Sequence, residues 1–179
     1  ESKAHLLMER LPEYPYLDIV DYPKRKYLYN DIACHIIGYV KAISQREYEV
    51  LKHLGYEKTD NIGKDGLEKY YDYELKGEDG FNYVEVDVKN VGLKEIESKR
   101  AIPGKDLYLT LDLDLQIHMT EFMQGKKGAF IAMDSKTGGI ITAVSSPTYN
   151  LNTLASKMSV EDWEKIQKNI NMPLTNRVS

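Results

Sequence analysis

The chain is poor in several residue types whose abundance would mark whole classes of protein. It has one cysteine, one tryptophan and three phenylalanines among 179 residues. A single cysteine excludes a disulfide within the chain, and Cys34, set in the apolar stretch 32–37, is predicted to be a buried small hydrophobe. No apolar run approaches the roughly 18 residues of a membrane span, and the first three residues do not begin a signal peptide. We therefore expect no targeting or membrane-spanning segment within this chain.

Residue patterns of several common chemistries are missing as well. One class of serine acyl transferases needs Ser-x-x-Lys, with lysine one helical turn after the nucleophile, and no serine here has lysine three residues on. Gly63-x-x-Gly66 lacks the Gly-Lys-Ser/Thr ending of a phosphate-binding loop. The histidines are His5, His35, His53 and His118. No two of them have the i, i+4 spacing of a helical metal site, so we expect no metal and no cofactor.

The charge balance argues against a nucleic-acid partner. The chain has 28 acidic and 24 basic residues, which gives a net charge of −4. Its one basic cluster, Lys24-Arg25-Lys26, is too short to follow a phosphate backbone.

The tripeptide Lys136-Thr137-Gly138 matches a catalytic motif of the same acyl transferases. Here it lies between Asp134 and Gly139, among residues that favour turns, with an apolar run on either side. We interpret it as the turn of a hairpin.

Capping signals predict two short helices early in the chain. Asp31 is predicted to cap a helix that ends at Gly38. Ser44 and Glu47 form a capping box for a second helix, which stops at Gly55.

A longer helix and a hairpin are predicted next. Residues 65–75 predict one helix, because apolar side chains recur at i, i+4 and i+8. That stripe consists of Leu67, Tyr71 and Leu75. Residues 81–88 alternate apolar and charged side chains, which predicts a half-buried strand, and the turn signal at 90–92 returns it as a second strand over 93–101.

The last part of the chain predicts a capped helix, a hairpin and one more helix. Asp112 caps a helix that ends at Gly125, and Ser159 opens the later helix. The apolar side chains of the first helix are Leu115, Met119, Phe122 and Met123. Strands at 129–133 and 140–144 are apolar enough to be covered on both faces. The last fifty or so residues are therefore expected to pack on the preceding part, to pair with another chain or to be poorly ordered, and the sequence leaves all three open.

An ordered series of segments carries more information than any single motif. The series has Arg-Lys-Tyr at 25–27, His-Ile-Ile-Gly-Tyr-Val at 35–40, a glycine-rich stretch at 62–80, Glu-Val-Asp at 85–87 and Pro-Gly-x-Asp-Leu-x-Leu-Thr-x-Asp-x-x-Leu-Gln at 103–116. It resembles class B penicillin-binding proteins of the elongation type, with gaps, from about residue 22 to residue 177. Leu28 and Asn30 stand where that family usually has proline and glycine.

The resemblance implies a set of motif positions. They are Arg25, Tyr27, His35, Gly38, Gly63, Gly66, Leu67, Glu68, Tyr71, Gly77 and Gly80. We interpret these residues as structural or partner-facing, and none as catalytic. Because Arg25 and Glu68 carry opposite charges in two of the motifs, we predict a salt bridge between them.

The fold that the resemblance implies is α+β. Residues 1–106 are expected to form an elongated mixed pedestal of β-hairpins and short helices, of the dimerisation-domain type. Residues 107–179 are expected to form the first helix and hairpin of a penicillin-binding transpeptidase fold, without its nucleophile motif. Residues 176–177 resemble the stretch just before the family's catalytic serine segment.

The function that the resemblance implies is non-catalytic for this chain. Full-length family members cross-link peptidoglycan stem peptides by serine acyl transfer on the periplasmic side of the inner membrane, held there by an N-terminal transmembrane helix that this chain does not contain. We expect no transpeptidase activity and no covalent penicillin binding here. The leading hypothesis is a spacer and docking surface for morphogenesis partners. These partners are a rod-shape scaffold protein and a polytopic glycan polymerase, and self-association through the 129–144 hairpin is also expected. The alternatives are a passive front part of the enzyme that only positions the active site, and a carbohydrate-binding domain.

Overall fold

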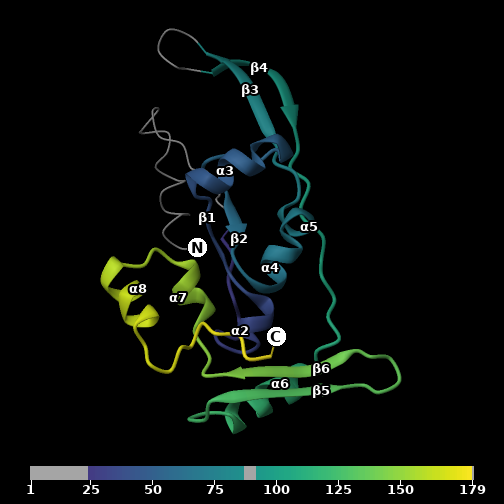
Figure 1. Cartoon of the computed structure of the whole chain (residues 1–179). Coiled ribbons are helices and arrows are strands. Elements are labelled where there is room, and N and C mark those ends of the chain that lie inside the picture. Colours follow the sequence, from purple (N-terminus) through teal and green to yellow (C-terminus); the bar gives the residue numbers. More distant parts are fainter. Residues whose placement is uncertain (1–23, 87–91, 179) are drawn as a thin grey trace, which may run out of the picture.

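The chain extends from a projecting hairpin at one end to a hairpin backed by a helix at the other (Figure 1). A computed structural model describes residues 24–86 and 92–178. Its helices are α2 (Cys34–Ile37), α3 (Gln45–Leu51), α4 (Gly66–Tyr70), α5 (Asp72–Lys76), α6 (Leu113–Phe122), α7 (Leu151–Ala155) and α8 (Val160–Gln167), with the 3-10 helix η2 (Lys52–Leu54). Its strands are β1 (Val40–Ala42), β2 (Asn61–Gly63), β3 (Phe81–Val86), β4 (Gly92–Lys99), β5 (Gly128–Met133) and β6 (Ile140–Ser146). These described strands pair antiparallel as β1–β2, β3–β4 and β5–β6, so the predicted α+β class of short helices and hairpins is confirmed.

Helix starts that depend on nearby residues follow the predictions. The Ser44 hydroxyl accepts a hydrogen bond from the Glu47 amide at 3.3 Å, and the Glu47 carboxylate accepts one from the Ser44 amide at 2.8 Å. This capping box opens α3, which continues through η2 to Gly55 with φ 83°. Asp112 and Ser159 cap α6 and α8 through their side-chain oxygens. All of these predicted caps are confirmed.

The predicted cap at Asp31 is wrong. Ala33, with φ 55°, is the N-cap residue of α2, and no side chain caps that helix. The Asp31 carboxylate instead accepts a hydrogen bond from the Thr148 hydroxyl at 2.9 Å. A partner from a distant segment therefore replaces the local amide, whereas Gly38 ends the helix as predicted.

The single helix predicted over 65–75 is two helices. The chain leaves α4 and enters α5 at Tyr71, where φ is −106° and ψ is 23°. The carboxylate of Asp72 accepts hydrogen bonds from the Gly63 amide at 2.8 Å and from the Tyr56 hydroxyl at 2.6 Å. These two bonds hold Asp72 against β2 and interrupt the helix at Tyr71. The predicted apolar stripe of Leu67, Tyr71 and Leu75 is therefore only half-buried.

The hairpin predicted after α5 is present, but its first strand is not half-buried. β3 pairs with β4 from Phe81 opposite Lys99 to Val86 opposite Gly92. Every side chain of residues 81–85 is exposed. The alternating pattern predicted the strand correctly, but it does not reveal whether another element packs on one face of that strand. The hairpin projects away from the other described elements (Figure 1). The predicted positions 87–91 lie outside the described residues.

The buried face of α6 is polar rather than apolar. Leu115 and Phe122 are 37% and 61% exposed, whereas Gln116 is 2% exposed. The Gln116 side chain donates to the Ala143 carbonyl at 2.9 Å and accepts from the Ala143 amide at 2.9 Å and from the Thr142 hydroxyl at 2.6 Å. Of the apolar side chains predicted for this helix, Met119 and Met123 are half-buried, and the buried positions are polar because α6 turns the Gln116 amide toward the backbone of β6.

β5 and β6 form the predicted hairpin, and its turn contains Lys136-Thr137-Gly138. The Asp134 carboxylate accepts hydrogen bonds from the Lys136 amide at 2.8 Å and from the Thr137 hydroxyl at 2.9 Å, and Gly138 has φ 73°. The interpretation as a turn is confirmed. The expectation that both strands are covered on both faces is wrong, because β5 alternates between half-buried and exposed residues.

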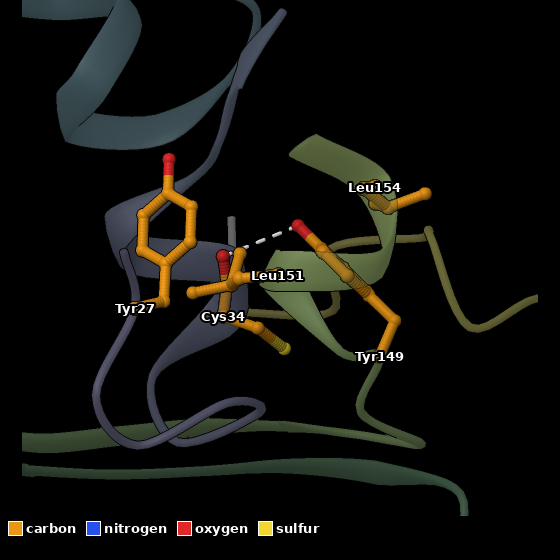
Figure 2. Close-up of a cluster of buried hydrophobic side chains, with 5 residues drawn as sticks. All are labelled: Tyr27, Cys34, Tyr149, Leu151 and Leu154. Atoms are coloured by element: carbon orange, nitrogen blue, oxygen red, sulfur yellow. Dashed lines mark hydrogen bonds between the residues drawn. The ribbon is translucent and has the colours of Figure 1, made fainter. Parts of the chain in front are cut away.

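A hydrophobic cluster joins the two halves of the chain (Figure 2). It consists of Tyr27, Cys34, Tyr149, Leu151 and Leu154. The Tyr149 hydroxyl donates to the Cys34 carbonyl at 3.1 Å, as Figure 2 shows. Cys34 is 1% exposed, which confirms its predicted burial. Of the three outcomes left open for the last fifty residues, the structure shows packing against the preceding part.

Gly38→Ala is expected to destabilise the fold far more than Gly55→Ala. Both glycines have positive φ, 75° and 83°, so both substitutions carry a left-handed backbone penalty of about 1–2 kcal/mol. A Cβ on Gly38 would also lie 1.8 Å from the Asp65 carbonyl oxygen, whereas a Cβ on Gly55 meets nothing within 4 Å. We expect losses in the free energy of unfolding of about 1–2 kcal/mol for Gly55→Ala and more than about 3 kcal/mol for Gly38→Ala. Urea denaturation followed by circular dichroism measures both, and equal losses would show that the Asp65 contact does not constrain the fold.

Candidate functional site

Several motif residues meet in one network around β2 and α4. Arg25 forms a bidentate ion pair with Glu68, with Nε 2.9 Å from Oε1 and NH2 3.0 Å from Oε2. Glu68 is 6% exposed, while Arg25 keeps part of its side chain in solvent. The predicted salt bridge is confirmed, and it ties the start of the described chain to α4.

Tyr27 lies beside this pair and connects its segment to β1. Its hydroxyl accepts a hydrogen bond from the Val40 amide at 3.0 Å. The Asn152 side chain accepts from the Tyr27 amide at 3.0 Å and donates to the Tyr27 carbonyl at 2.8 Å. Burial raises the pKa of Tyr27 above its usual range. Burial also raises the pKa of Glu68, although the Arg25 guanidinium opposes that rise.

Three motif glycines, Gly38, Gly63 and Gly66, allow main-chain contacts that leave no room for a side chain. A Cβ on Gly63 would lie 2.1 Å from the Glu68 carbonyl oxygen. A Cβ on Gly66 would lie 2.4 Å from the Ile36 carbonyl oxygen and 2.7 Å from the Gly38 amide nitrogen. The glycine requirement at these positions is therefore steric, and it brings α2 and α4 together backbone to backbone.

The remaining pedestal motif residues do not all join this network. Gly77 packs against the returning chain after β4, where a Cβ would lie 2.3 Å from the Ile102 carbonyl oxygen. Gly80 meets the same stretch of chain. Leu67 and Tyr71 are half-buried on the α4 side. The motif thus forms two separate groups of contacts.

His35 faces the far part of the chain instead. It is 5% exposed, its Nε2 lies 2.8 Å from the Pro173 carbonyl oxygen and its Nδ1 lies 3.3 Å from the Cys34 sulfur. The Tyr149 ring meets the imidazole edge-on at 4.8 Å. Because a carbonyl oxygen only accepts, Nε2 carries the proton and Nδ1 accepts from the thiol. Burial lowers the pKa of His35 and raises the pKa of the Cys34 thiol to about 12.

A cleft of about 510 Å³ opens between the Arg25–Glu68 network and the connector, residues 105–112. Its apolar lining includes Tyr27, Leu28, Tyr29, Leu107, Leu109 and Leu111. Leu28 is 74% exposed and Tyr108, also on the cleft, is 91% exposed. We call this the connector cleft.

A second cleft, of about 730 Å³, lies at the base of the β3–β4 hairpin, and Gly77 and Gly80 line it. Exposed apolar side chains continue from it along the hairpin. They are Phe81 (39% exposed), Tyr83 (59%), Val84 (48%) and Ile96 (67%). We call these four residues the hairpin surface.

Three polar residues that are not among the predicted site residues join separate segments of the chain. Gln116, Asp72 and Asn152 each hydrogen-bond to the main chain of a distant segment. An amide or carboxylate beside apolar residues is equally typical of a protein surface, so the sequence offered no distinguishing signal for them.

The arrangement is suited to holding segments and presenting surfaces. In the part of the chain that the structure describes, no three His, Cys, Asp or Glu side chains gather where they could hold a metal ion. Among the described helices, none has the length and apolarity needed to cross a membrane. The buried serines serve the main chain, since Ser145 accepts a hydrogen bond from the Arg177 amide at 3.0 Å and Ser146 donates to the Lys126 carbonyl at 2.7 Å.

Sequence relatives place this geometry in a family. Residues 1–109 match the family of the penicillin-binding protein dimerisation domain. The chain is 36% identical over 171 residues to Peptidoglycan D,D-transpeptidase MrdA of Haemophilus influenzae and 34% identical over 170 residues to that of Escherichia coli K12. Each match covers 93% of this chain, and the chain spans about a quarter of these relatives' length, 26% and 27%.

Solved structures have the same fold in the matching region. The complex between penicillin-binding protein PBP2 and MreC from Helicobacter pylori matches with a TM-score of 0.82 and 30% identity, covering 98% of this chain and 32% of that chain. PBP2 of Pseudomonas aeruginosa in complex with WCK 5153 matches with a TM-score of 0.73 and 29% identity, covering 90% of this chain and 32% of that one. The chain is therefore similar in fold to about a third of these PBP2 chains.

Removing Arg25 is expected to leave the Glu68 carboxylate buried without its cation. Arg25→Ala should lower the free energy of unfolding at pH 7 by roughly 2–3 kcal/mol, less than for a fully buried pair because Arg25 is partly exposed. Without Arg25 the pKa of Glu68 rises further. A carboxyl with a raised pKa in the folded state favours folding at low pH, so the loss should shrink between pH 7 and pH 5. Urea denaturation at both pH values measures this change.

Two further variants control this prediction. Glu68→Gln in the Arg25→Ala background removes the unpaired charge and should restore part of the lost stability. Lys52→Ala breaks the exposed Lys52–Glu49 pair and should have little effect. A loss in Arg25→Ala that is identical at pH 7 and pH 5 would contradict the assignment of a buried, unpaired carboxylate.

Proposed function

The chain belongs to the penicillin-binding protein dimerisation-domain family, and from that premise we propose that it is the non-catalytic pedestal part of a peptidoglycan D,D-transpeptidase. The full-length parent cross-links stem peptides by serine acyl transfer during cell-wall elongation and so maintains cell shape. The pedestal acts as a spacer and as a docking surface for a rod-shape scaffold protein. The parent works on the periplasmic side of the inner membrane, anchored by an N-terminal transmembrane helix.

The observation that carries this proposal is the likeness to a PBP2 solved in complex with MreC. Nearly the whole chain takes part in that likeness, including the hairpin and the clefts. The relatives named as MrdA transpeptidases support the activity of the parent. In this proposal residues 1–106 are the pedestal and residues 107–179 begin the transpeptidase domain.

The hairpin surface is the proposed contact for the scaffold protein. An isolated two-stranded hairpin is marginally stable in water, and this one keeps large apolar side chains exposed. Covering such a side chain completely contributes about 1.5–3 kcal/mol, so a partner that covers several of them gains affinity and stabilises the hairpin. The motif residues have a different role in this proposal, because Gly38, Gly63 and Glu68 are buried and support the pedestal from within.

A passive front part of the enzyme is the second candidate. The burial of so many motif residues favours it, since positioning alone accounts for their contacts. A polytopic glycan polymerase is a further proposed partner, and self-association through the β5–β6 hairpin stays a prediction. Direct binding experiments with this chain separate these roles from docking.

Calorimetric titration of the chain with the periplasmic part of its rod-shape scaffold protein is expected to show binding. Tyr83→Glu should weaken that binding about tenfold or more, because it places a charge at the centre of the hairpin surface. Tyr108→Glu is the matched control on the connector, at a side chain that is 91% exposed, and should bind as the parent chain does. Thermal melting of both variants should match the unsubstituted chain. A fluorescent penicillin should not label the unsubstituted chain.

Three results would contradict these expectations in different ways. Absence of binding by this chain, with binding by the full-length parent, would reject the docking module and leave the passive role. Equal weakening by Tyr83→Glu and Tyr108→Glu would reject the hairpin surface as the specific contact. Stoichiometric labelling by penicillin would overturn the non-catalytic assignment.

A further inference from the structure

A buried imidazole joins α2 to a stretch of chain 138 residues later. His35 Nε2 lies 2.8 Å from the carbonyl oxygen of Pro173, which is itself buried. We call residues 171–177 the Pro173 segment. The Arg177 guanidinium donates hydrogen bonds to three main-chain carbonyl groups within this segment, at 3.0 to 3.2 Å, and so holds it as one folded unit.

The Pro173 segment has a separate attachment to β6. The Ser145 hydroxyl accepts from the Arg177 amide at 3.0 Å and donates to the Thr175 carbonyl at 3.3 Å. The imidazole bond differs from this attachment because it reaches α2, in the other half of the chain. Leu174 of the segment also packs against the cluster that contains Cys34, so His35 supplies the polar part of the contact that holds the segment against α2.

The surroundings of the imidazole favour its neutral form. Cys34 on α2 faces Nδ1, the Pro173 carbonyl faces Nε2, and the Tyr149 ring lies edge-on at 4.8 Å. The charged groups that act on it are Asp65, the N-cap residue of α4, and Arg177 of the Pro173 segment. Burial, which has the largest effect, and Arg177 disfavour a protonated ring, whereas the Pro173 carbonyl and Asp65 favour it, and the net effect is a lowered pKa.

We propose that His35 is a pH-sensitive latch: in its neutral form it positions the Pro173 segment on α2, and when protonated it releases that segment. Protonation would put a second N–H opposite the Cys34 sulfur, which is a weak acceptor, inside a site shielded from water. Release hydrates the charged ring. The latch goes beyond the proposed function, because it operates in this chain without any partner.

The direction of the pH dependence follows from burial. Desolvation lowers the pKa of His35 in the closed arrangement, whereas a released, hydrated ring has the ordinary value of about 6.5. The open state therefore binds more protons as pH falls. The latch is fully closed above about pH 6.5 and is lost as pH falls through the lowered pKa of the closed state.

The chain contains its own reporter for this opening. Cys34 is the single cysteine and is 1% exposed, so its thiol becomes reactive when the junction opens. The thiol reacts with 4,4′-dithiodipyridine at a rate that can be measured in the folded chain and in the urea-unfolded chain at the same pH. The unfolded rate divided by the folded rate is a protection factor. Because both rates are taken at one pH, this factor does not contain the pH dependence of the free thiol's reactivity. We expect this factor to fall between pH 7.5 and pH 5.0, because a ring whose pKa is lowered in the closed arrangement favours the open arrangement as pH falls.

His35→Gln is the matched non-titrating variant. Its side-chain amide can still donate to the Pro173 carbonyl but takes up no proton, so its protection factor should change less than about twofold over the same range. His118→Gln, at an exposed position on α6, should keep the full loss of the unsubstituted chain. The protection factor of the Arg177 amide against hydrogen exchange, taken relative to the rate of an unstructured peptide at the same pH, gives a second readout. It should fall at pH 5.0 in the unsubstituted chain and not in His35→Gln, because release of the segment breaks the bond from this amide to Ser145. Far-UV circular dichroism should stay constant throughout.

The proposal fails if the unsubstituted chain keeps the same protection factor at pH 7.5 and pH 5.0. It also fails if His35→Gln loses protection to the same extent. Where His35→Gln does not fold, a nuclear magnetic resonance titration of the unsubstituted chain decides. The His35 ring must then titrate below its ordinary pKa together with a fall in the protection factor of the Arg177 amide, and titration with unchanged protection would overturn the latch.

Discussion

The pedestal depends on main-chain contacts that only glycine allows. An added Cβ on Gly38, Gly63 or Gly66 would lie between 1.8 and 2.4 Å from a carbonyl oxygen of a neighbouring segment. This close approach brings α2, β2 and α4 into one unit and turns Glu68 inward. A carboxylate in that position requires a cation, and Arg25 supplies it through two hydrogen bonds. The close backbone contacts at the glycines therefore create the need for a cation beside Glu68. Both requirements, for glycine and for paired charges, are visible in the sequence as motif residues.

The junction between the two halves of the chain depends on polar contacts around a small apolar cluster. Asn152 and His35 each direct a side chain at main-chain groups of the other half of the chain. Among the described residues, no buried side-chain nitrogen or oxygen lacks a hydrogen-bond partner. Apolar surfaces tolerate sliding, whereas hydrogen bonds to particular main-chain groups fix one register, so these residues set the orientation of the halves.

Sequence patterns predicted this fold where the forces are local and missed it where they are not. The capping box of Ser44 and Glu47 needs only residues three apart, so the sequence contained all the necessary information. Asp31 was assigned a cap because the sequence does not reveal Thr148, the partner that replaces the local amide. The helix break before α5 and the polar face of α6 have the same cause, a distant main-chain group that competes with local preference. Within the site, the Arg25–Glu68 pair was predictable because one motif contains a cation and another contains an anion, and opposite charges attract. The contacts of Gln116 and Asn152 were not, because an amide side chain carries no mark of the backbone that it will meet.

The projecting hairpin keeps apolar side chains in water, and its strands differ in a way that bears on what can cover them. The β4 sequence contains Lys94, Glu95, Glu97 and Lys99. Charged residues on an edge strand disfavour pairing with an arbitrary second strand. On β3, Phe81 and Tyr83 already contact each other with ring centroids 5.0 Å apart. Side chains that are ordered against one another lose less conformational entropy when they are covered, which favours binding by a surface of matching shape. Charged residues on the edge strand disfavour self-association through that edge, and the preformed apolar contact on β3 favours a partner of matching shape. A hairpin with both features is better suited to docking than an exposed strand that lacks them.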